Sequence, residues 1–277
     1  MQDSTALPDL QVMPTALLLL HEDFDPRRVE RLSKRILEEG FLKNPPVVAS
    51  IPGSGNFVIL DGANRVLAFK LAGIPHIVAQ LVHYGDPGVV LDTWYHVISG
   101  MPLHEFEQAL INVIGFHLLP CNLEDARQAL AMEEALAYII AESGVRKVIP
   151  PPGRHRDLLL LREIVATYRG KADIYRASND IWEIQRPYYP NITALVIYPR
   201  LRPVDILRAA LNECKVPSGL TRHIITYRAL NINIPIGILM ADWSYERKQQ
   251  WLHEWLMERM GSNSIRYYAE STFSFNE

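Results

Sequence analysis

The stretch FVILDGANRVLAFKLAGI, residues 57–74, decides how the first part of the chain folds. Its first four residues are apolar without a break and include β-branched and aromatic side chains, which is typical of a short strand covered on both faces. From Ala63 onward the apolar residues follow the helical period instead, and Gly73 is a helix stop signal. Asp61 and Gly62 are therefore predicted to lie where a strand passes into a helix.

Such a junction suits a phosphate group. The first N–H groups of a helix have no partner within the helix, and the helix dipole favours an anion there. Arg65, one turn into the helix, adds a planar guanidinium that can hold a phosphate through two hydrogen bonds. The same pattern also fits a tight turn followed by a surface arginine, because short motifs with a glycine occur widely. The local pattern alone leaves both interpretations open.

Strands and helices alternate around this stretch. Asp25 is expected to cap a helix that begins at Pro26 and ends at Gly40. An extended segment is expected within residues 11–20 and further strands within 45–51 and 76–84, so the order is β-α-β-β-α-β. This order predicts a compact mixed α/β domain, with residues 1–98 as the first domain of the chain and its structured part beginning near residue 10.

Residues 99–277 are expected to form a second mixed α/β domain. Apolar residues with helical spacing fill 123–144, and Gly144 closes that pattern. Residues 223–239 are predicted to form paired strands. The last strong helix is predicted to place five side chains in the core, namely Trp251, Leu252, Trp255, Leu256 and Met260. The remaining expected elements are helices within 157–170, 202–214 and 246–261 and a strand within 193–199.

The composition is that of an ordinary globular protein. The 277 residues carry a formal net charge of −3, which does not indicate a protein that coats nucleic acid. Two cysteines provide neither a disulfide framework nor metal-ligand spacing. The apolar run at 16–20 is too short to span a bilayer, and no basic segment precedes it. We therefore expect a cytoplasmic protein without a membrane partner, and the sequence does not indicate its oligomeric state.

Two further segments display polar side chains beside predicted strands. His21 and Glu22 follow an apolar strand and precede the capped helix, so Glu22 is either a general base or a solvated loop carboxylate. Thr221, Arg222 and His223 stand between a glycine turn and a strand, where an arginine can bind a carboxylate or a phosphate, or simply be solvated. The chain has no H-E-x-x-H, Walker A, G-x-S-x-G or G-x-G-x-x-G motif.

Four motifs in this order resemble one family. They are LHEDFDPRRVERL, VILDGANRVLAFKLAG, LDTW and VPSGLTRHIITYRALNINIPIGIL. The first domain resembles the ParB/sulfiredoxin superfamily, and the whole set resembles the free L-serine kinases, most closely the ATP-dependent type of siderophore biosynthesis. An archaeal ADP-dependent type belongs to the same family. The likeness is weakest over residues 100–170.

The resemblance implies transfer of a phosphoryl group from ATP or ADP to free L-serine, with Mg²⁺ as cofactor. Glu22 matches the catalytic glutamate, and Asp61 matches an acidic residue near the metal and the phosphates. The phosphate-binding set that the resemblance implies is His21, Gly62, Ala63, Asn64 and Arg65. The substrate-binding set is Thr93, Trp94, Thr221, Arg222 and His223, although packing also explains a tryptophan at position 94. Because these residues come from both parts of the chain, the site is expected between the two domains.

One residue departs from the family pattern. The family has a histidine before the motif arginine, where this chain has Asn64. An asparagine can donate to a phosphate oxygen but cannot titrate. A catalytically silent sensor of a nucleotide or metabolite therefore stays open as an alternative. A ParB-type DNA-binding switch is the other alternative, but its Gly-Glu-Arg-Arg box and basic helix-turn-helix are not evident.

Overall fold

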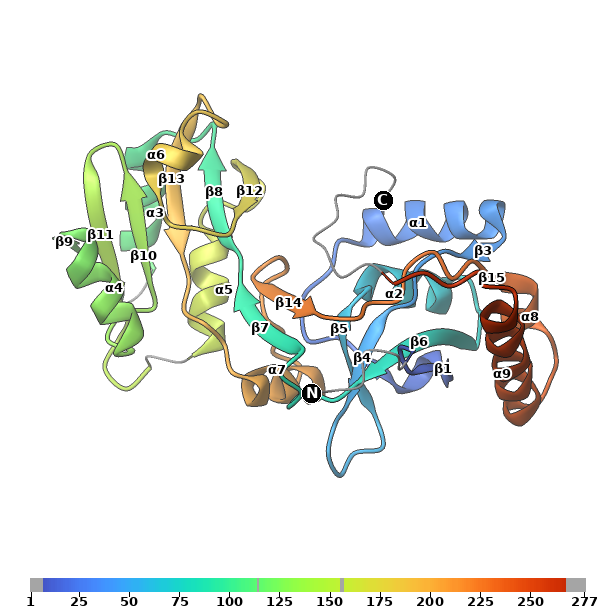
Figure 1. Ribbon diagram of the computed structural model, residues 1–277. Helices are drawn as coiled ribbons and strands as arrows, with labels where there is room; N and C mark the ends of the chain where they lie inside the picture. The colour runs from blue at the N-terminus through green and yellow to red at the C-terminus, as the bar shows by residue number, and fades with distance from the viewer. Residues whose placement is uncertain (1–6, 114, 155–156, 268–277) are drawn as a thin grey trace. The chain divides into compact units, whose positions relative to one another are not determined.

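The computed structural model describes residues 7–113, 115–154 and 157–267, and the chain forms two compact units (Figure 1). The first unit comprises the chain up to Leu19, residues Asp25–Val89 and the chain from Ile225 onward. The second unit comprises Leu20–Phe24 and Val90–Ile224. The fold class is mixed α/β, as expected.

This division differs from a single cut after residue 98. Strand β8 (Tyr95–Ser99) pairs with β12 (Asp173–Ala177) and β13 (Ile192–Ile197), so a cut at 98 would pass through a strand of the second unit's sheet. In the first unit, β15 (Ile234–Pro235) pairs with β3 (Phe41–Leu42), far away in sequence. Backbone pairing over long sequence separations therefore sets these boundaries.

The first unit is built on a five-stranded sheet. β4 and β5 are antiparallel neighbours, while β4 and β6 run parallel. The apolar run at 57–60 is buried in this sheet apart from the half-buried Phe57. In spatial order, the strands are β1 (Leu10–Pro14), β6 (His76–Val82), β4 (Val47–Ser50), β5 (Phe57–Asp61) and β2 (Leu18–Leu19), and the short 3₁₀ turn η1 (Thr15–Leu17) precedes β2.

The two helices predicted in this unit are present as α1 (Pro26–Glu39) and α2 (Ala63–Leu71). The Asp25 side chain accepts a hydrogen bond from the Arg27 N–H at 3.0 Å, and Gly40 ends α1 in the left-handed conformation. The two helices pack against each other, and α2 also contacts β6. Near the C-terminus, α8 (Ile236–Met240) contacts β6 and α9 (Tyr245–Gly261) contacts β1.

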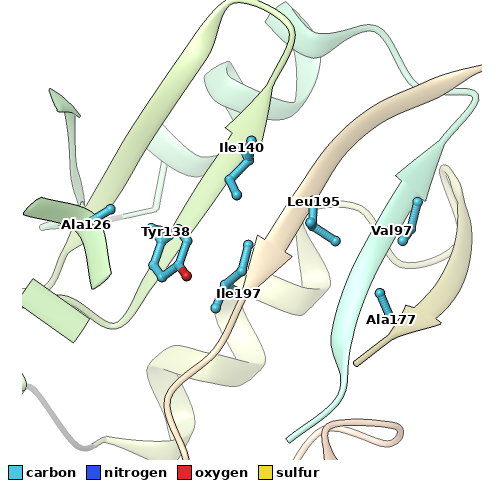
Figure 2. Packing of buried hydrophobic residues seen from close by; sticks show 7 residues of the cluster. All are labelled: Val97, Ala126, Tyr138, Ile140, Ala177, Leu195 and Ile197. Carbon is cyan, nitrogen blue, oxygen red and sulfur yellow. The ribbon is translucent and has the colours of Figure 1, made fainter. Parts of the chain in front are cut away.

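The second unit is built on a six-stranded sheet whose strands pair antiparallel. Figure 2 shows part of its core, where Leu195 and Ile197 of β13 lie beside Tyr138 and Ile140 of β10. In spatial order, the strands are β12, β8, β13, β10 (Ala137–Ala141), β11 (Gly144–Ile149) and β9 (His117–Cys121). The helices are α3 (Leu103–Ile111), α4 (Leu123–Ala131), α5 (Leu158–Ala166), α6 (Trp182–Gln185) and α7 (Pro203–Leu211), and β7 (Val89–Thr93) pairs with β14 (Thr221–Ile225) in a two-stranded sheet.

The prediction of one helix over 123–144 is wrong. The helix α4 stops at Ala131, Glu133 adopts a positive φ of 62°, and the following segment AYIIA becomes β10. All five residues of β10 are buried. An alanine-rich apolar run has helical spacing by chance, and burial within the sheet overrides that preference.

Two predictions near the C-terminus are only partly right. Residues 223–239 contain the end of β14, β15 and α8, but positive φ angles at Tyr227, Asn231 and Asn233 interrupt any continuous strand pairing. In α9, only Leu252 of the five predicted core residues is buried. Trp251, Trp255 and Leu256 are half-buried, and Met260 is 49% exposed. Within the described ranges, none of the helices combines the length and apolarity needed to cross a membrane.

Candidate functional site

The strand-to-helix junction of the first unit holds an ion cluster. Asp61 ends β5, Gly62 caps α2 with a φ of 85°, and Arg65 lies in the first turn of that helix. Arg65 Nη2 donates to Asp61 Oδ2 at 2.6 Å, and its Nη1 donates to the Asn44 carbonyl at 2.8 Å. The guanidinium is thus held in one orientation at the start of the helix.

Only glycine fits position 62 without rearrangement. A Cβ there would lie 2.9 Å from the Cα of Pro46 and 2.8 Å from Arg65 Nη2, and the left-handed backbone disfavours a side chain. Ala63 and Asn64 are half-buried in the first turn of α2. The N–H groups of such a first turn have no acceptor within the helix.

A second arginine, which the sequence did not reveal, joins this cluster. Arg228 Nη2 donates to the same Oδ2 of Asp61. Arg228 Nε is buried and has no hydrogen-bond partner among the described residues. We call Asp61, Arg65 and Arg228 the phosphate cluster.

The backbone on both sides of Arg228 is held by one buried side chain. Gln80 Nε2 donates to the Tyr227 carbonyl at 3.1 Å, and Gln80 Oε1 accepts from the Ala229 N–H at 2.9 Å. Gln80 is 3% exposed, on β6. No helix or strand pattern in the sequence singled out Arg228, because it lies in an irregular segment where three residues have positive φ angles. Only folding brings this arginine to Asp61.

The phosphate cluster carries two guanidinium groups and one carboxylate, so its formal charge is +1. This excess suits an anion, and guanidinium groups bind phosphate oxygens through paired hydrogen bonds. Across the described residues, no group of three or more His, Cys, Asp or Glu side chains could hold a metal by itself. A single carboxylate still fits Mg²⁺, because this ion is commonly bound by one or two carboxylates together with substrate phosphates and water.

The second unit holds the other predicted cluster, which we call the glutamate cluster: His21, Glu22, Gly219 and Thr221. Glu22 Oε1 accepts hydrogen bonds from the Thr221 N–H at 2.8 Å and from the Thr221 hydroxyl. Glu22 Oε2 accepts from the Gly219 N–H at 3.1 Å. Since the Thr221 hydroxyl donates to Glu22, its oxygen accepts from His21 Nε2, which lies 2.9 Å away.

Burial and hydrogen bonding act on Glu22 in opposite directions. Burial raises the pKa of this carboxyl, while the bonds from Thr221 and Gly219 and the charge of Arg176 lower it. Burial is the larger effect, so the pKa lies above the ordinary value of 4.5. A carboxylate with a raised pKa is a better proton acceptor than a solvated one.

The other predicted substrate residues occupy the same unit. The Thr93 hydroxyl donates to the Pro199 carbonyl at 3.1 Å, and Thr93 is buried. The Arg222 guanidinium lies over the Trp94 ring, with its Cζ 4.3 Å from the ring centroid. Arg222 Nη1 is also 3.9 Å from a carboxylate oxygen of Asp92.

His223 lies near His21, with a centroid distance of 5.5 Å between the two rings. The structure therefore brings together His21, Glu22, Thr221 and His223, and separately pairs Trp94 with Arg222. A cavity of about 530 Å³ lies elsewhere in this unit, and none of the predicted site residues lines it. Its polar lining includes Arg127 and Asp180, which already bind each other.

The chain is similar to known serine kinases over nearly its whole length. It is 22% identical to the ATP-dependent L-serine kinase SbnI of Staphylococcus aureus over 272 residues, which cover 95% of this chain and 96% of that protein. No family model matches the chain.

Two solved structures have the same fold. SbnI with a C-terminal truncation from Staphylococcus aureus superposes with a TM-score of 0.73 at 20% identity, covering 91% of this chain and 97% of that one. A free serine kinase in complex with AMP superposes with a TM-score of 0.68 at 17% identity, covering 86% and 97%. The fold of this chain is therefore that of the free serine kinases.

Proposed function

We propose that this chain, a homologue of the free serine kinases, transfers the γ-phosphoryl group of ATP to the hydroxyl of free L-serine and releases O-phospho-L-serine and ADP. The observation that carries the proposal is the half-buried Glu22 carboxylate, held by two backbone N–H groups and a hydroxyl. The relatives' names, which specify ATP and L-serine, support the choice of substrates.

Glu22 is proposed to receive the proton of the serine hydroxyl. Each carboxylate oxygen offers two acceptor positions, and Thr221 fills both at Oε1. At Oε2, the Gly219 N–H is the partner found among the described residues, so a second position is left for the substrate hydroxyl. As the serine oxygen bonds to the γ-phosphorus, the bond from that phosphorus to the bridging oxygen of ADP breaks.

The phosphate cluster is proposed to bind the nucleotide. Phosphoryl transfer depends mainly on positioning and on stabilising the charge of the phosphate oxygens. Arg65 and Arg228 would exchange part of their contact with Asp61 for phosphate oxygens, and the N–H groups of Gly62, Ala63 and Asn64 would donate to the same anion. Asp61 would hold Mg²⁺, which neutralises phosphate charge when bound.

Amino-acid recognition is assigned to the residues around Glu22. Arg222, with its stacked and fixed guanidinium, would bind the serine carboxylate. Thr221 would act mainly by orienting Glu22, because its hydroxyl donates there. Trp94 and His223 would shape the surrounding surface, and the buried His21 and Thr93 would support it from beneath.

A mass-spectrometric assay tests this proposal. The purified protein is incubated with Mg²⁺, L-serine and either ATP or ADP, and O-phospho-L-serine is measured. We expect the product with ATP, and Glu22→Gln should lower kcat by about a hundredfold or more, the scale of a lost general base. ATP binding should be retained in that variant.

The possible results separate the alternatives. Product from ADP alone would change the assigned donor. The wild-type protein could bind nucleotide yet make no phosphoserine, while Asn64→His makes phosphoserine. That result would favour a sensor built on a kinase fold. Near-normal turnover in Glu22→Gln would remove the role given to this glutamate.

A further inference from the structure

Three polar side chains form a buried chain of hydrogen bonds beneath the glutamate cluster. His96 Nδ1 lies 2.7 Å from the Tyr168 hydroxyl, and that hydroxyl also contacts the Tyr198 hydroxyl. His96 Nε2 lies 3.2 Å from the carbonyl oxygen of Gly219. His96, Tyr168 and Tyr198 are each at most 2% exposed. Burying polar groups is costly unless each has a partner, and here each does.

Which group donates in each of these bonds follows from the one group that can only accept a hydrogen bond. The Gly219 carbonyl can only accept, so His96 must carry its proton on Nε2. Nδ1 then accepts from the Tyr168 hydroxyl, whose oxygen in turn accepts from Tyr198. Burial, with the nearby Arg176 and Arg169 guanidinium groups, lowers the pKa of His96 to about 4, so the ring is neutral at physiological pH.

Gly219 connects this chain of bonds to Glu22. Its carbonyl faces His96, while its N–H donates to Glu22 Oε2. The next residue is fixed in the same way, because the Leu220 carbonyl accepts from the Trp94 N–H at 2.8 Å. The loop therefore has one side anchored on residues 94–96 and the other side bound to the glutamate carboxylate.

The conformation of Gly219 makes this anchoring necessary. Its φ is 88°, and a Cβ at this position would lie 2.9 Å from Arg176 Nη2. Glycine has more backbone freedom than any other type of residue. The two peptide groups on either side of Gly219 therefore keep their orientations only if other groups hold them. The hydrogen bond from His96 holds one of them.

From this geometry we infer that His96, with its Nε2–H directed at the Gly219 carbonyl and its Nδ1 bonded to Tyr168, is a positioning residue that orients the Gly219 loop and thereby the Glu22 carboxylate. The kinetic part of this inference rests on the proposed function, because it takes Glu22 as the proton acceptor. The structural part, that His96 sets the hydrogen bonding of Glu22, does not depend on the reaction.

The chain offers matched variants. His96→Phe keeps a ring but removes the donor, whereas His96→Gln places an amide N–H near the position of Nε2 and should restore the bond. Tyr168→Phe removes the donor to His96 Nδ1, which is one of the two bonds that hold the ring. Tyr198→Phe, the control, removes a buried hydroxyl of the same kind but leaves the bond from Tyr168 to His96 in place.

The first measurement needs no activity. The pKa of the Glu22 carboxyl is followed by carbon NMR, with Glu22→Gln identifying the signal. The groups that act on Glu22 are Gly219, Thr221 and the Arg176 guanidinium, and only the Gly219 bond depends directly on His96. Because that bond lowers the pKa, we expect a higher pKa in His96→Phe, little change in His96→Gln and none in Tyr198→Phe. Nitrogen NMR should show the Nε2–H tautomer in the wild type, and Tyr168→Phe, which leaves Nδ1 without its donor, should raise the pKa of Glu22 by less than His96→Phe does.

The second measurement is kinetic. We expect kcat to fall about tenfold in His96→Phe, with KM for ATP unchanged and the acid limb of the pH profile moved to higher pH. In a Glu22→Gln background, the same substitution should have no further effect on kcat, because the two residues act as one unit.

An unchanged pKa of Glu22 in folded His96→Phe, or a full additional loss of kcat in the double variant, would overturn the inference. If His96→Phe does not fold, Tyr168→Phe against Tyr198→Phe decides in the same way. A wild-type protein without kinase activity would refute the proposed function while leaving the NMR result to decide the structural part.

Discussion

The position of Arg228 in the candidate site is visible only in the tertiary structure. This arginine shares Asp61 Oδ2 with Arg65, yet it lies 167 positions from that aspartate in sequence. The local pattern D-G-x-x-R was enough to predict Asp61, Gly62 and Arg65 as one group, because all three lie within one strand-to-helix turn. No periodicity marks Arg228, since its segment is neither helix nor strand.

Arg228→Ala should weaken ATP binding by roughly ten- to a hundredfold, because a hydrogen bond to a charged group contributes about 1.5–3 kcal/mol. Arg228→Lys should restore only part of the affinity, since lysine keeps the charge but loses the planar pair of donors. Calorimetric titration with ATP measures both effects. Arg35→Ala, which removes the same charge from the exposed face of α1 in the same unit, is the control. Equal affinities for Arg228→Ala and the control would place Arg228 outside the nucleotide site.

At the scale of elements, capping signals predicted helices well. The start of α1 at Pro26 and its end before Gly40 are confirmed, because side-chain caps and a left-handed glycine are local features. The strand β10 was missed because its residues are fully buried and have no alternation of polar and apolar side chains. Similarly, the aromatic residues of α9 were assigned to the core from spacing alone, whereas the helix contacts β1 mainly through a narrower face.

The junction of β5 and α2 gives the prediction at this scale. Gly62→Ala should reduce ATP affinity as strongly as Arg65→Ala, because the new methyl group would displace Arg65 and approach the Pro46 backbone. We also expect a lower melting temperature, since a left-handed alanine costs roughly 1 kcal/mol relative to glycine. Gly73→Ala is the matched control: Gly73 also has a positive φ, but a Cβ there meets nothing within 4 Å. If both variants lose stability yet both keep ATP affinity, the close packing at Gly62 has no part in binding.

At the scale of the whole molecule, the sequence predicted two mixed α/β parts but not how the chain is shared between them. Glu22 belongs to the second unit although it lies near the N-terminus, because it forms a parallel β-bridge with Val216. The C-terminal segment belongs to the first unit through β15, α8 and α9. Such pairings join residues about 200 positions apart, and no local pattern encodes them.

This division predicts how the first unit can be isolated. Residues 1–98 alone should not fold stably, because they lack α8, α9 and the bond from the Val12 N–H to Gln249 Oε1 at 2.8 Å. Joining residues 1–89 to 225–277 through a short Gly-Ser linker should give a cooperatively folding protein. The linker can be short because the Gly88 carbonyl accepts from the Thr226 N–H at 2.9 Å.

Circular dichroism on heating and calorimetry with ATP test both chains. The joined chain contains Asp61, Arg65 and Arg228, so we expect it to bind ATP and to melt at a higher temperature when ATP is added, since a ligand that binds only the folded state stabilises it. It should make no phosphoserine, because Gly219 and Thr221 are absent and Glu22 loses its hydrogen-bond donors. A 1–98 fragment that melts cooperatively and binds ATP as tightly as the joined chain would instead support a first domain that ends at residue 98. In that case ATP binding would require neither the C-terminal segment nor Arg228, which belongs to it.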